Sequence, residues 1–245
     1  MNIQPSPSLV RQPPVLFRAP ICLNRELIEV LPAGSWLGRP AYLVGGGPSL
    51  EGFDWKLLRG RRTIAVNVAF YKFEPTVIFS MDTRCLNWII GGTYEHKFPG
   101  LRERFNKTTA YKAWLLTYTA QLREDVFVVR VLKNYDYGLR EFSWDLREGI
   151  GHGNNSGFAA FNLAVLLGAN PIYLLGFDML HSGGKSHFHG GHPVPQDEAK
   201  AISYAAPFEK IAPEISRRGI RIINLNPDSG LRCFEFQDPK EALAC

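Results

Sequence analysis

The chain of 245 residues is long enough for one large domain, or for one domain with an insertion. Its 45% hydrophobic and 12% aromatic content is unlike that of a disordered chain. No apolar run approaches the roughly 18 residues of a membrane helix, so we expect a soluble protein without a membrane span. The net charge of +5 favours anionic partners such as nucleotides, acidic sugars or nucleic acid, although a solvated basic surface would have the same balance.

The N-terminal sequence predicts an extended segment. Proline is dense in the first 40 residues, which hold seven of the 17 in the chain, and this predicts an arm over residues 1–39. Such an arm would lie on the domain or on a partner subunit, and it would allow a homo-oligomer. The chain does not begin with a basic stretch followed by an apolar block, so no secretion signal is expected. The four cysteines lack C-x-x-C spacing, which argues against a zinc knuckle or a disulfide scaffold and predicts a cytoplasmic protein.

The first ordered element is a strand that runs into a glycine-rich turn. Residues 41–44 are mainly apolar, and the sequence then reads Gly45, Gly46, Gly47, Pro48, Ser49. We expect Pro48 to open a helix over 50–58 with Ser49 as its cap. The turn then suits the phosphate or ribose of a nucleotide, because it brings backbone N–H groups and a helix start close to the ligand. A tight turn without a ligand is the alternative, since the third glycine of the dinucleotide fingerprint is missing.

Two more short apolar runs, 63–67 and 76–80, predict strands that are covered on both faces. Asn67 ends the first run and Asp82 closely follows the second. Ligands of open α/β sheets bind outside the carboxyl ends of the strands, so both are candidate site residues. Capping and turn formation are the alternative roles. Within residues 85–150 the sequence predicts a strand over 125–132 and a loop over 134–138, but it does not indicate a catalytic or binding role for this region.

A second glycine-rich segment, 151–157, precedes an apolar helix over 158–168. Asn155 or Ser156 would cap this helix, and together with Gly157 they offer its N-terminus to an anion. A strand over 171–178 follows and ends in Asp178. The C-terminal part predicts a helix over 197–218 bent by two prolines, a strand over 220–226 and an edge segment over 231–236.

Between these elements, residues 178–196 predict a lid rich in histidine and glycine. A histidine here can accept a proton from a hydroxyl near neutral pH, which is the role of a general base. The alternative is a metal site formed by His187, His189, His192 and Asp178. Simple exposure is a third possibility. Together the elements predict an α/β domain over 40–245, with a mostly parallel sheet and helices on both faces.

Four segments together resemble a known superfamily: Gly45–Leu50, the strand that ends at Asn67, the Asn155–Gly157 helix start, and Ile172–Asp178. They are similar to bacterial sialyltransferases that use CMP-sialic acid and have one Rossmann-like domain with a lid. They also resemble 6-hydroxymethylpterin diphosphokinase-like proteins and phage proteins with the same core. The resemblance covers residues 41–84 and 150–226.

The resemblance implies a role for each matching residue. The 45–49 turn would lie near the nucleotide phosphate and ribose, and Asn67 would contact the nucleotide or its sugar. Asp82 stands where the sialyltransferases have an asparagine that touches the donor. Asn155, Ser156 and Gly157 would hold phosphate and cytidine, and His192 would be the catalytic base. Leu180 stands in the place of the family's tyrosines, so His181 or Lys185 would have to stabilise the leaving phosphate.

These observations support three functions. The first is a nucleotide-dependent glycosyltransferase that moves a sugar from a CMP-type donor to a hydroxyl of a glycan, a small molecule or a modified nucleic acid, with no obligatory metal. The second is a diphosphotransferase that uses ATP and Mg²⁺, held by Asp82 and Asp178. The third is a non-catalytic, phage-type accessory protein that binds nucleotides or nucleic acid.

Overall fold

The computed structural model describes residues 24–116, 122–132, 142–180, 187–188 and 197–244. Within them one eight-stranded sheet has the order β5-β4-β3-β2-β1-β6-β7-β8, and every neighbouring pair of strands is parallel. The strands are β1 (Ala41–Val44), β2 (Thr63–Val66), β3 (Val77–Ser80), β4 (Tyr111–Leu116), β5 (Val126–Arg130), β6 (Ile172–Leu175), β7 (Ile222–Asn224) and β8 (Glu235–Phe236).

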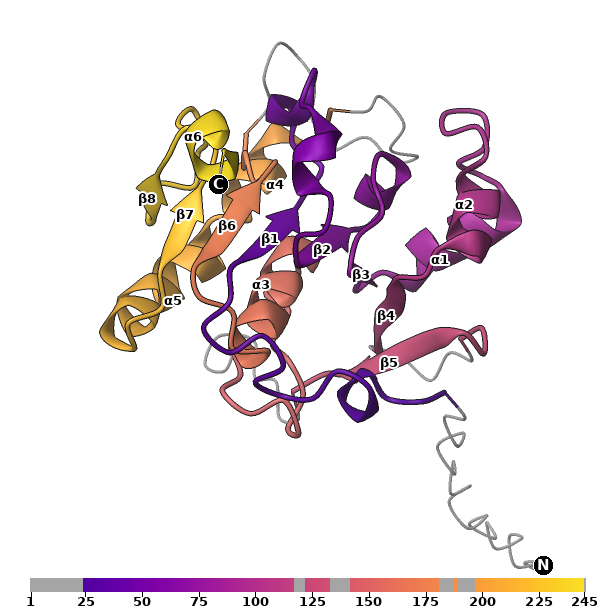
Figure 1. The fold of residues 1–245 in the computed structure, drawn as a ribbon, viewed down its shortest axis with the longest axis horizontal. Coiled ribbons are helices and arrows are strands. Elements are labelled where there is room, and N and C mark those ends of the chain that lie inside the picture. The colour runs from indigo at the N-terminus through magenta and orange to yellow at the C-terminus, as the bar shows by residue number, and fades with distance from the viewer. Residues whose placement is uncertain (1–23, 117–121, 133–141, 181–186, 189–196, 245) are drawn as a thin grey trace, which may run out of the picture.

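Strand β1 lies at the centre of the sheet, between β2 and β6 (Figure 1). From β1 the chain adds β2 to β5 on one side and then returns to place β6 to β8 on the other. The strand order reverses between β1 and β6, and open α/β sheets bind ligands outside the carboxyl ends of the strands at such a switch point. A parallel sheet wound in this way, with helices on both faces, is a Rossmann-like α/β fold. The predicted fold class is therefore confirmed.

Helices cover both faces of the sheet, because the strands are apolar on both sides. Ala41 and Leu43 of β1 belong to one core, and Tyr42 and Val44 belong to the other. The helical elements are η1 (Leu27–Glu29), η2 (Pro48–Leu50), η3 (Trp55–Leu58), η4 (Ala69–Tyr71), α1 (Thr83–Gly91), α2 (Leu101–Lys107), α3 (Ser156–Leu166), α4 (Glu198–Ser203), α5 (Ala206–Arg217) and α6 (Pro239–Leu243). The first core includes side chains of α3 and α5, and the second includes side chains of α1, α2, α6 and the 3₁₀ turns η2, η3 and η4.

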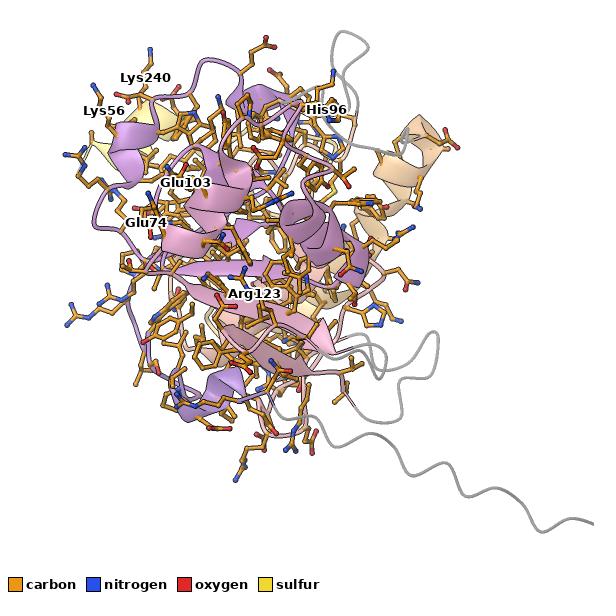
Figure 2. The ribbon with its side chains drawn as sticks, turned by 90° about the vertical axis from the view of Figure 1, so that its right-hand side faces the viewer. Lys56, Glu74, His96, Glu103, Arg123 and Lys240 are labelled. Atoms are coloured by element: carbon orange, nitrogen blue, oxygen red, sulfur yellow. The ribbon has the colours of Figure 1, made fainter. Side chains whose placement is uncertain are left out.

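Charged residues lie on the outside of the layer that covers the second core. Figure 2 shows Lys56 of η3, Glu103 of α2 and Lys240 of α6 at the surface, and all three are exposed. Glu103 pairs there with Lys107, one turn further along α2, at 2.6 Å. Both side chains are solvated, so this ion pair adds little to the stability of the fold.

Helix α3 is the central helix of the first core. Every residue from Gly157 to Leu166 is buried, because the sequence is almost entirely apolar, and the helix packs against β1, β2 and β3. Its one buried polar side chain, Asn162, accepts hydrogen bonds from the N–H groups of Ser143 and Gly151 and donates one to the Ser143 carbonyl. Asn162 thus fixes the segment that leads into the helix.

The segment before β1 is built into the domain over residues 24–39. Leu27 and Trp36 are buried in the first core, and Glu26 forms a parallel β-bridge with Val128 of β5. Three N–H groups of the segment close the carboxyl end of α3, with Gly34 bonded to Leu166, Trp36 to Leu167 and Gly38 to Gly168 at 3.1, 2.7 and 3.0 Å. Helix carbonyls that would otherwise lack partners are thereby satisfied. The rest of the predicted arm, residues 1–23, lies outside the described residues.

Some predicted elements differ from the structure. The helix predicted over 50–58 with Ser49 as its cap is wrong: two 3₁₀ turns form, and Ser49 lies inside the first. Gly52 breaks the segment because its φ is +77°, and Asp54 caps the second turn. The helix predicted over 197–218 is divided near residues 204–205 into α4 and α5. None of the helices in the described part of the chain is long and apolar enough to cross a bilayer.

Candidate functional site

The glycine turn after β1 lies against the chain that leaves β6. A Cβ atom on Gly45 would come within 2.5 Å of the Gly176 carbonyl oxygen, and one on Gly47 within 2.4 Å of Cγ of Asp178. Real Cβ atoms do not approach other atoms this closely. Glycine is therefore required at both positions, so that the ends of the two central strands can pack together.

Most N–H groups of this turn bond within the protein. The N–H of Gly45 donates to the Leu175 carbonyl at 2.8 Å, and that of Gly47 donates to the Gly176 carbonyl at 2.9 Å. The N–H of Ser49 donates to Asp178 Oδ2 at 2.7 Å. These groups do not point toward a ligand. Since only a three-residue 3₁₀ turn follows, the turn also lacks the dipole of a full helix.

The carboxylate of Asp178 joins three segments at the switch point. The Ser49 hydroxyl donates to Oδ1 at 2.6 Å, and the side-chain amide of Asn226, after β7, donates to the same oxygen at 2.8 Å. Asp178 is 4% exposed, so this buried charge is stabilised by the bonds from Ser49 and Asn226. Both oxygens accept bonds from the protein, which gives Asp178 a structural role at this edge.

The middle glycine of the turn faces the lid. A Cβ on Gly46 would meet Cδ2 of His187 at 2.8 Å, and the Gly46 carbonyl accepts a hydrogen bond from Phe188 N–H at 2.9 Å. The Phe188 ring packs on Trp55 with 5.5 Å between ring centroids. One imidazole of the predicted lid is therefore held directly above the glycine turn.

Asn67 follows β2 at the same edge, in the left-handed backbone region with φ +56°. Asparagine tolerates this conformation better than most side chains. The Asn67 N–H donates to the Phe79 carbonyl at 2.9 Å, and Oδ1 accepts from the hydroxyl of Ser80, the last residue of β3, at 2.8 Å. No described residue accepts a hydrogen bond from the half-buried Asn67 Nδ2.

Asp82 caps helix α1. Its Oδ1 accepts from the N–H of Arg84 at 2.9 Å, and its carboxylate also pairs with the Arg84 guanidinium, with 2.8 Å from Nη2 to Oδ2. The carbonyl of Asp82 accepts from Nε1 of Trp114 at 3.2 Å. Asp82, like Asp178, already has partners in the protein for both carboxylate oxygens.

The start of α3 brings a full helix N-terminus to this edge. Oδ1 of Asn155 accepts from the N–H groups of Gly157 and Phe158 at 2.7 and 3.3 Å, which is the predicted cap. The hydroxyl oxygen of Ser156 accepts from the Met81 N–H at 3.3 Å and so joins the helix to the end of β3. No described residue accepts from the Ser156 hydroxyl or from its backbone N–H.

His152 shapes the loop before the helix. Its Nδ1 accepts from the Asn154 N–H at 3.0 Å, and its carbonyl accepts from the Asn155 N–H at 2.8 Å. Burial lowers the pKa of the His152 imidazole below its usual value. The neutral form, with Nδ1 as an acceptor, is therefore favoured, and it supports the left-handed conformation of Asn154 with φ +53°.

The two glycine-rich corners, which are the turn 45–47 after β1 and the segment 151–157 at the start of α3, are separated by one aromatic ring. A Cβ on Gly45 would contact Cδ2 of Phe177 at 3.3 Å, and a Cβ on Gly157 would contact Cε1 of the same ring at 2.9 Å. The turn after β1 and the start of α3 therefore face each other across Phe177 at the carboxyl edge of the sheet.

Most side-chain acceptors of this edge are occupied, since those of Asn155, Asp178 and Asp82 and Oδ1 of Asn67 accept from protein donors. Several donors of the edge have no partner among the described residues. They include the Gly46 N–H, the Asn67 side-chain NH₂, the Ser156 N–H and the Ser156 hydroxyl. Such a set suits a ligand rich in acceptor oxygens.

Several predicted residues cannot be placed. His181, Lys185, His189 and His192 lie outside the described residues, and with them the predicted base and two of the four alternative metal ligands. Among the residues that the structure describes, no group of three His, Cys, Asp or Glu side chains is placed to hold a metal ion.

Comparisons with known proteins place the fold. The fold is similar to that of a glycosyltransferase. The solved structure of the MAf glycosyltransferase from Magnetospirillum magneticum AMB-1 aligns with 84% of this chain at a TM-score of 0.56 and 14% sequence identity. The aligned part is 34% of that longer protein, so the chain spans about a third of its length. No protein-family model and no curated protein matches the sequence.

Some residues of this edge are not predicted from the sequence. The sequence indicates Ser80 only weakly as a residue of this edge, because it is the polar residue at the end of an otherwise apolar strand. Asn226 is likewise a polar residue after a strand, but nothing in the sequence relates it to Asp178, 48 residues earlier. Phe177 reads as an ordinary strand residue. Its position between two glycines follows only from the packing.

Proposed function

We propose that this chain is a nucleotide-dependent glycosyltransferase that binds its donor between the glycine turn after β1 and the start of α3. The observation that carries the proposal is the set of donors at the switch point, on Gly46, Asn67 and Ser156, that have no partner among the described residues. Phosphate oxygens accept hydrogen bonds and are negatively charged. The N-terminus of the 11-residue helix α3 adds a favourable partial charge for them.

The chemistry follows from this arrangement. A departing nucleotide phosphate would be stabilised by fixed N–H and O–H donors, which need no reorganisation during the reaction. The acceptor hydroxyl would lose its proton to a lid histidine, and His192 is proposed for this role from the sequence resemblance. His181 or Lys185 would add positive charge near the leaving group. The glycosyltransferase of similar fold supports a sugar as the transferred group, and the resemblance to sialyltransferases supports a CMP-type donor.

The direct test is ligand binding followed by turnover. Wild-type protein is screened by thermal shift against CMP, UDP and GDP sugars and ATP, with and without Mg²⁺, and nucleotide release is then measured with the hits. A ligand at 100 times its Kd should add about 2.7 kcal/mol to the free energy of unfolding. The proposal fails if no nucleotide sugar raises the melting temperature. Activity with ATP that requires Mg²⁺ would indicate a diphosphotransferase, and steeply salt-dependent DNA binding would indicate the accessory class.

A matched pair of variants locates the site. Asn67→Ala removes a proposed ligand contact, and we expect the Kd for the donor to rise about tenfold. Asn170→Ala is the control, because Asn170 is also hydrogen-bonded to the backbone but lies before β6, at the opposite edge of the sheet. It should leave the donor Kd unchanged. Equal effects of the two variants would place the donor elsewhere.

A further inference from the structure

The end of β3 holds a buried hydroxyl beneath the proposed donor site. Ser80 is 0% exposed, and alternation along Val77–Ser80 places its side chain on the same face as Ile78, in the second core. A serine in this position buries a polar group among apolar ones, which is unfavourable unless the group is hydrogen-bonded. Its partners therefore indicate what it does.

The Ser80 hydroxyl donates to one atom and accepts from others. It donates to Asn67 Oδ1 at 2.8 Å and accepts from the N–H of Asp82 at 3.1 Å. The thiol of Cys85 also forms a side-chain hydrogen bond with Ser80, and burial raises the pKa of this thiol to about 12, so it stays protonated. A protonated thiol can donate or accept, so Cys85 does not set the direction of the serine proton. The Asp82 N–H can only donate to Ser80 and Asn67 Oδ1 can only accept from it, so the serine proton is directed toward Asn67.

This direction fixes the amide of Asn67. The two ends of an asparagine amide differ, because the oxygen only accepts and the nitrogen only donates. With Ser80 donating to Oδ1, the NH₂ group is directed away from β3, and no described residue accepts from it. The backbone on either side is held as well, since the Asn67 N–H bonds to Phe79.

We propose that Ser80 is a positioning residue that sets the specificity of the donor site through Asn67. By holding Oδ1, it makes Asn67 a pure hydrogen-bond donor toward the ligand, and so selects an acceptor such as a phosphoryl or carbonyl oxygen over a hydroxyl or amino group. This inference rests on the proposed function for the identity of the ligand. The fixed orientation of the amide can be tested without one.

The test is a double-mutant cycle on Ser80→Ala and Asn67→Ala, with the Kd of the best nucleotide-sugar donor from the screen as the readout. Ser80→Ala should raise the Kd about tenfold in the wild-type background and by less than about twofold when residue 67 is already alanine. Ser80→Thr keeps the hydroxyl and should restore most of the affinity. Equal effects of Ser80→Ala in both backgrounds, or no effect, would overturn the proposal.

A control variant separates positioning from stability. Thr63→Val removes another buried hydroxyl from the β2–β3 pair, one that accepts from the Thr76 N–H at the opposite edge of the sheet. It should lower the melting temperature without changing the donor Kd. If it weakens donor binding as much as Ser80→Ala does, the effect of Ser80 is general destabilisation and the proposal is wrong.

A structural measurement keeps this test separate from the proposed function. In a crystal structure of ligand-free Ser80→Ala protein, the Asn67 amide should be rotated or should occupy two orientations. An amide that stays in place overturns the positioning role, whatever the protein binds. If the wild type binds no nucleotide sugar but the amide still turns, the proposed function fails and the positioning role of Ser80 stands.

Discussion

The two glycine-rich corners look alike in sequence but differ in what their glycines do. In the turn after β1, Gly45 and Gly47 make room for the Gly176 carbonyl and the Asp178 carboxylate, and the N–H groups of Gly45, Gly47 and Ser49 bond inside the protein. At the start of α3 the cap is satisfied by Asn155, and an 11-residue helix follows. The first corner joins the two halves of the sheet, whereas the second presents a helix N-terminus.

This difference matters because a glycine-rich sequence after a strand is usually interpreted as a phosphate site. Here close packing explains two of the three glycines of the first corner, and Gly46 faces His187, in the described part of the lid. The ligand-facing groups come from several elements that meet at this edge, with Ser156 on α3 and Asn67 after β2. Substitutions at the first corner should therefore reduce stability most, and substitutions at the second should reduce ligand binding as well.

The largest effect is expected for Gly47→Ala. The new Cβ would lie 2.4 Å from Asp178 Cγ and 2.7 Å from the Gly176 carbonyl oxygen, so buried backbone must move. We expect a loss of about 3 kcal/mol or more in the free energy of unfolding, measured by urea denaturation. Gly91→Ala is the matched control, because a Cβ there meets nothing within 4 Å and the residue is helical. It should be neutral or stabilising by up to about 1 kcal/mol. A stable Gly47→Ala protein would contradict the packing role of this corner.

Asp178→Asn should have the next largest effect. The carboxylate accepts three hydrogen bonds, one at Oδ2 from the Ser49 N–H and two at Oδ1 from the Ser49 hydroxyl and the Asn226 amide. Asparagine has an NH₂ group in place of one of these oxygens, so a donor would face a donor at one of the two positions. We expect a loss of about 2 kcal/mol in unfolding free energy. The same denaturation experiment measures it, with Asp228→Asn at an exposed position as the control. If Asp178 instead serves as an Mg²⁺ ligand, the variant would keep its stability and lose a metal-dependent activity.

At the second corner, Asn155→Ala removes the cap of α3 and should lower the unfolding free energy by about 1 kcal/mol. Donor binding should weaken severalfold as well, because the adjacent N–H groups are no longer held in place. Asn155→Ser keeps a capping oxygen and should retain most of both properties. Thermal unfolding and donor titration of the two variants check this. A loss of stability with unchanged donor affinity would show that this corner too is only structural.

The smallest effect is expected from pH. The pKa of His152 is lowered from 6.5 by burial, so the unfolded chain takes up a proton at a higher pH than the folded protein does. Stability should therefore fall as the pH decreases from 6.5 toward the folded pKa of His152. Urea denaturation from pH 8 to pH 5 should show a steeper decline for the wild type than for His152→Gln. Parallel curves would mean that His152 does not titrate differently on folding.

Much of the fold can be predicted from the sequence, because its strands are short runs of apolar residues with little ambiguity. The strands at 63–67 and 172–175 and helix α3 lie where the pattern predicts them. Helices α1 and α2 and strand β4 were missed, since aromatic and charged residues alternate irregularly from 85 to 116. These elements are stabilised by packing between aromatic rings, such as those of Phe105 and Trp114, whose centroids are 5.8 Å apart. Contacts of this kind join distant residues and are not visible in a local sequence pattern.

The sequence indicates where the candidate site would lie, but not which hydrogen bonds form within it. Polar residues at the strand ends locate the edge, because all strands of a parallel sheet point the same way. Which groups remain available to a ligand depends on partners far away in the sequence. Ser49 bonds to Asp178 across 129 residues, and Ser156 bonds to Met81 across 75. Hydrogen bonds of this kind are fixed only by the assembled fold.

The central position of β1 has a consequence for how the chain is made. Strand β1 pairs with β2 almost at once, but its other partner, β6, follows only after some 130 residues, since Ala41 lies opposite Ile172. While the ribosome is still adding β3 to β5, the nascent sheet ends at an open edge of β1. An unpaired edge in the middle of the future sheet is a site for mispairing between neighbouring chains. The half-made protein is thus most exposed to aggregation just before residues 172–175 emerge.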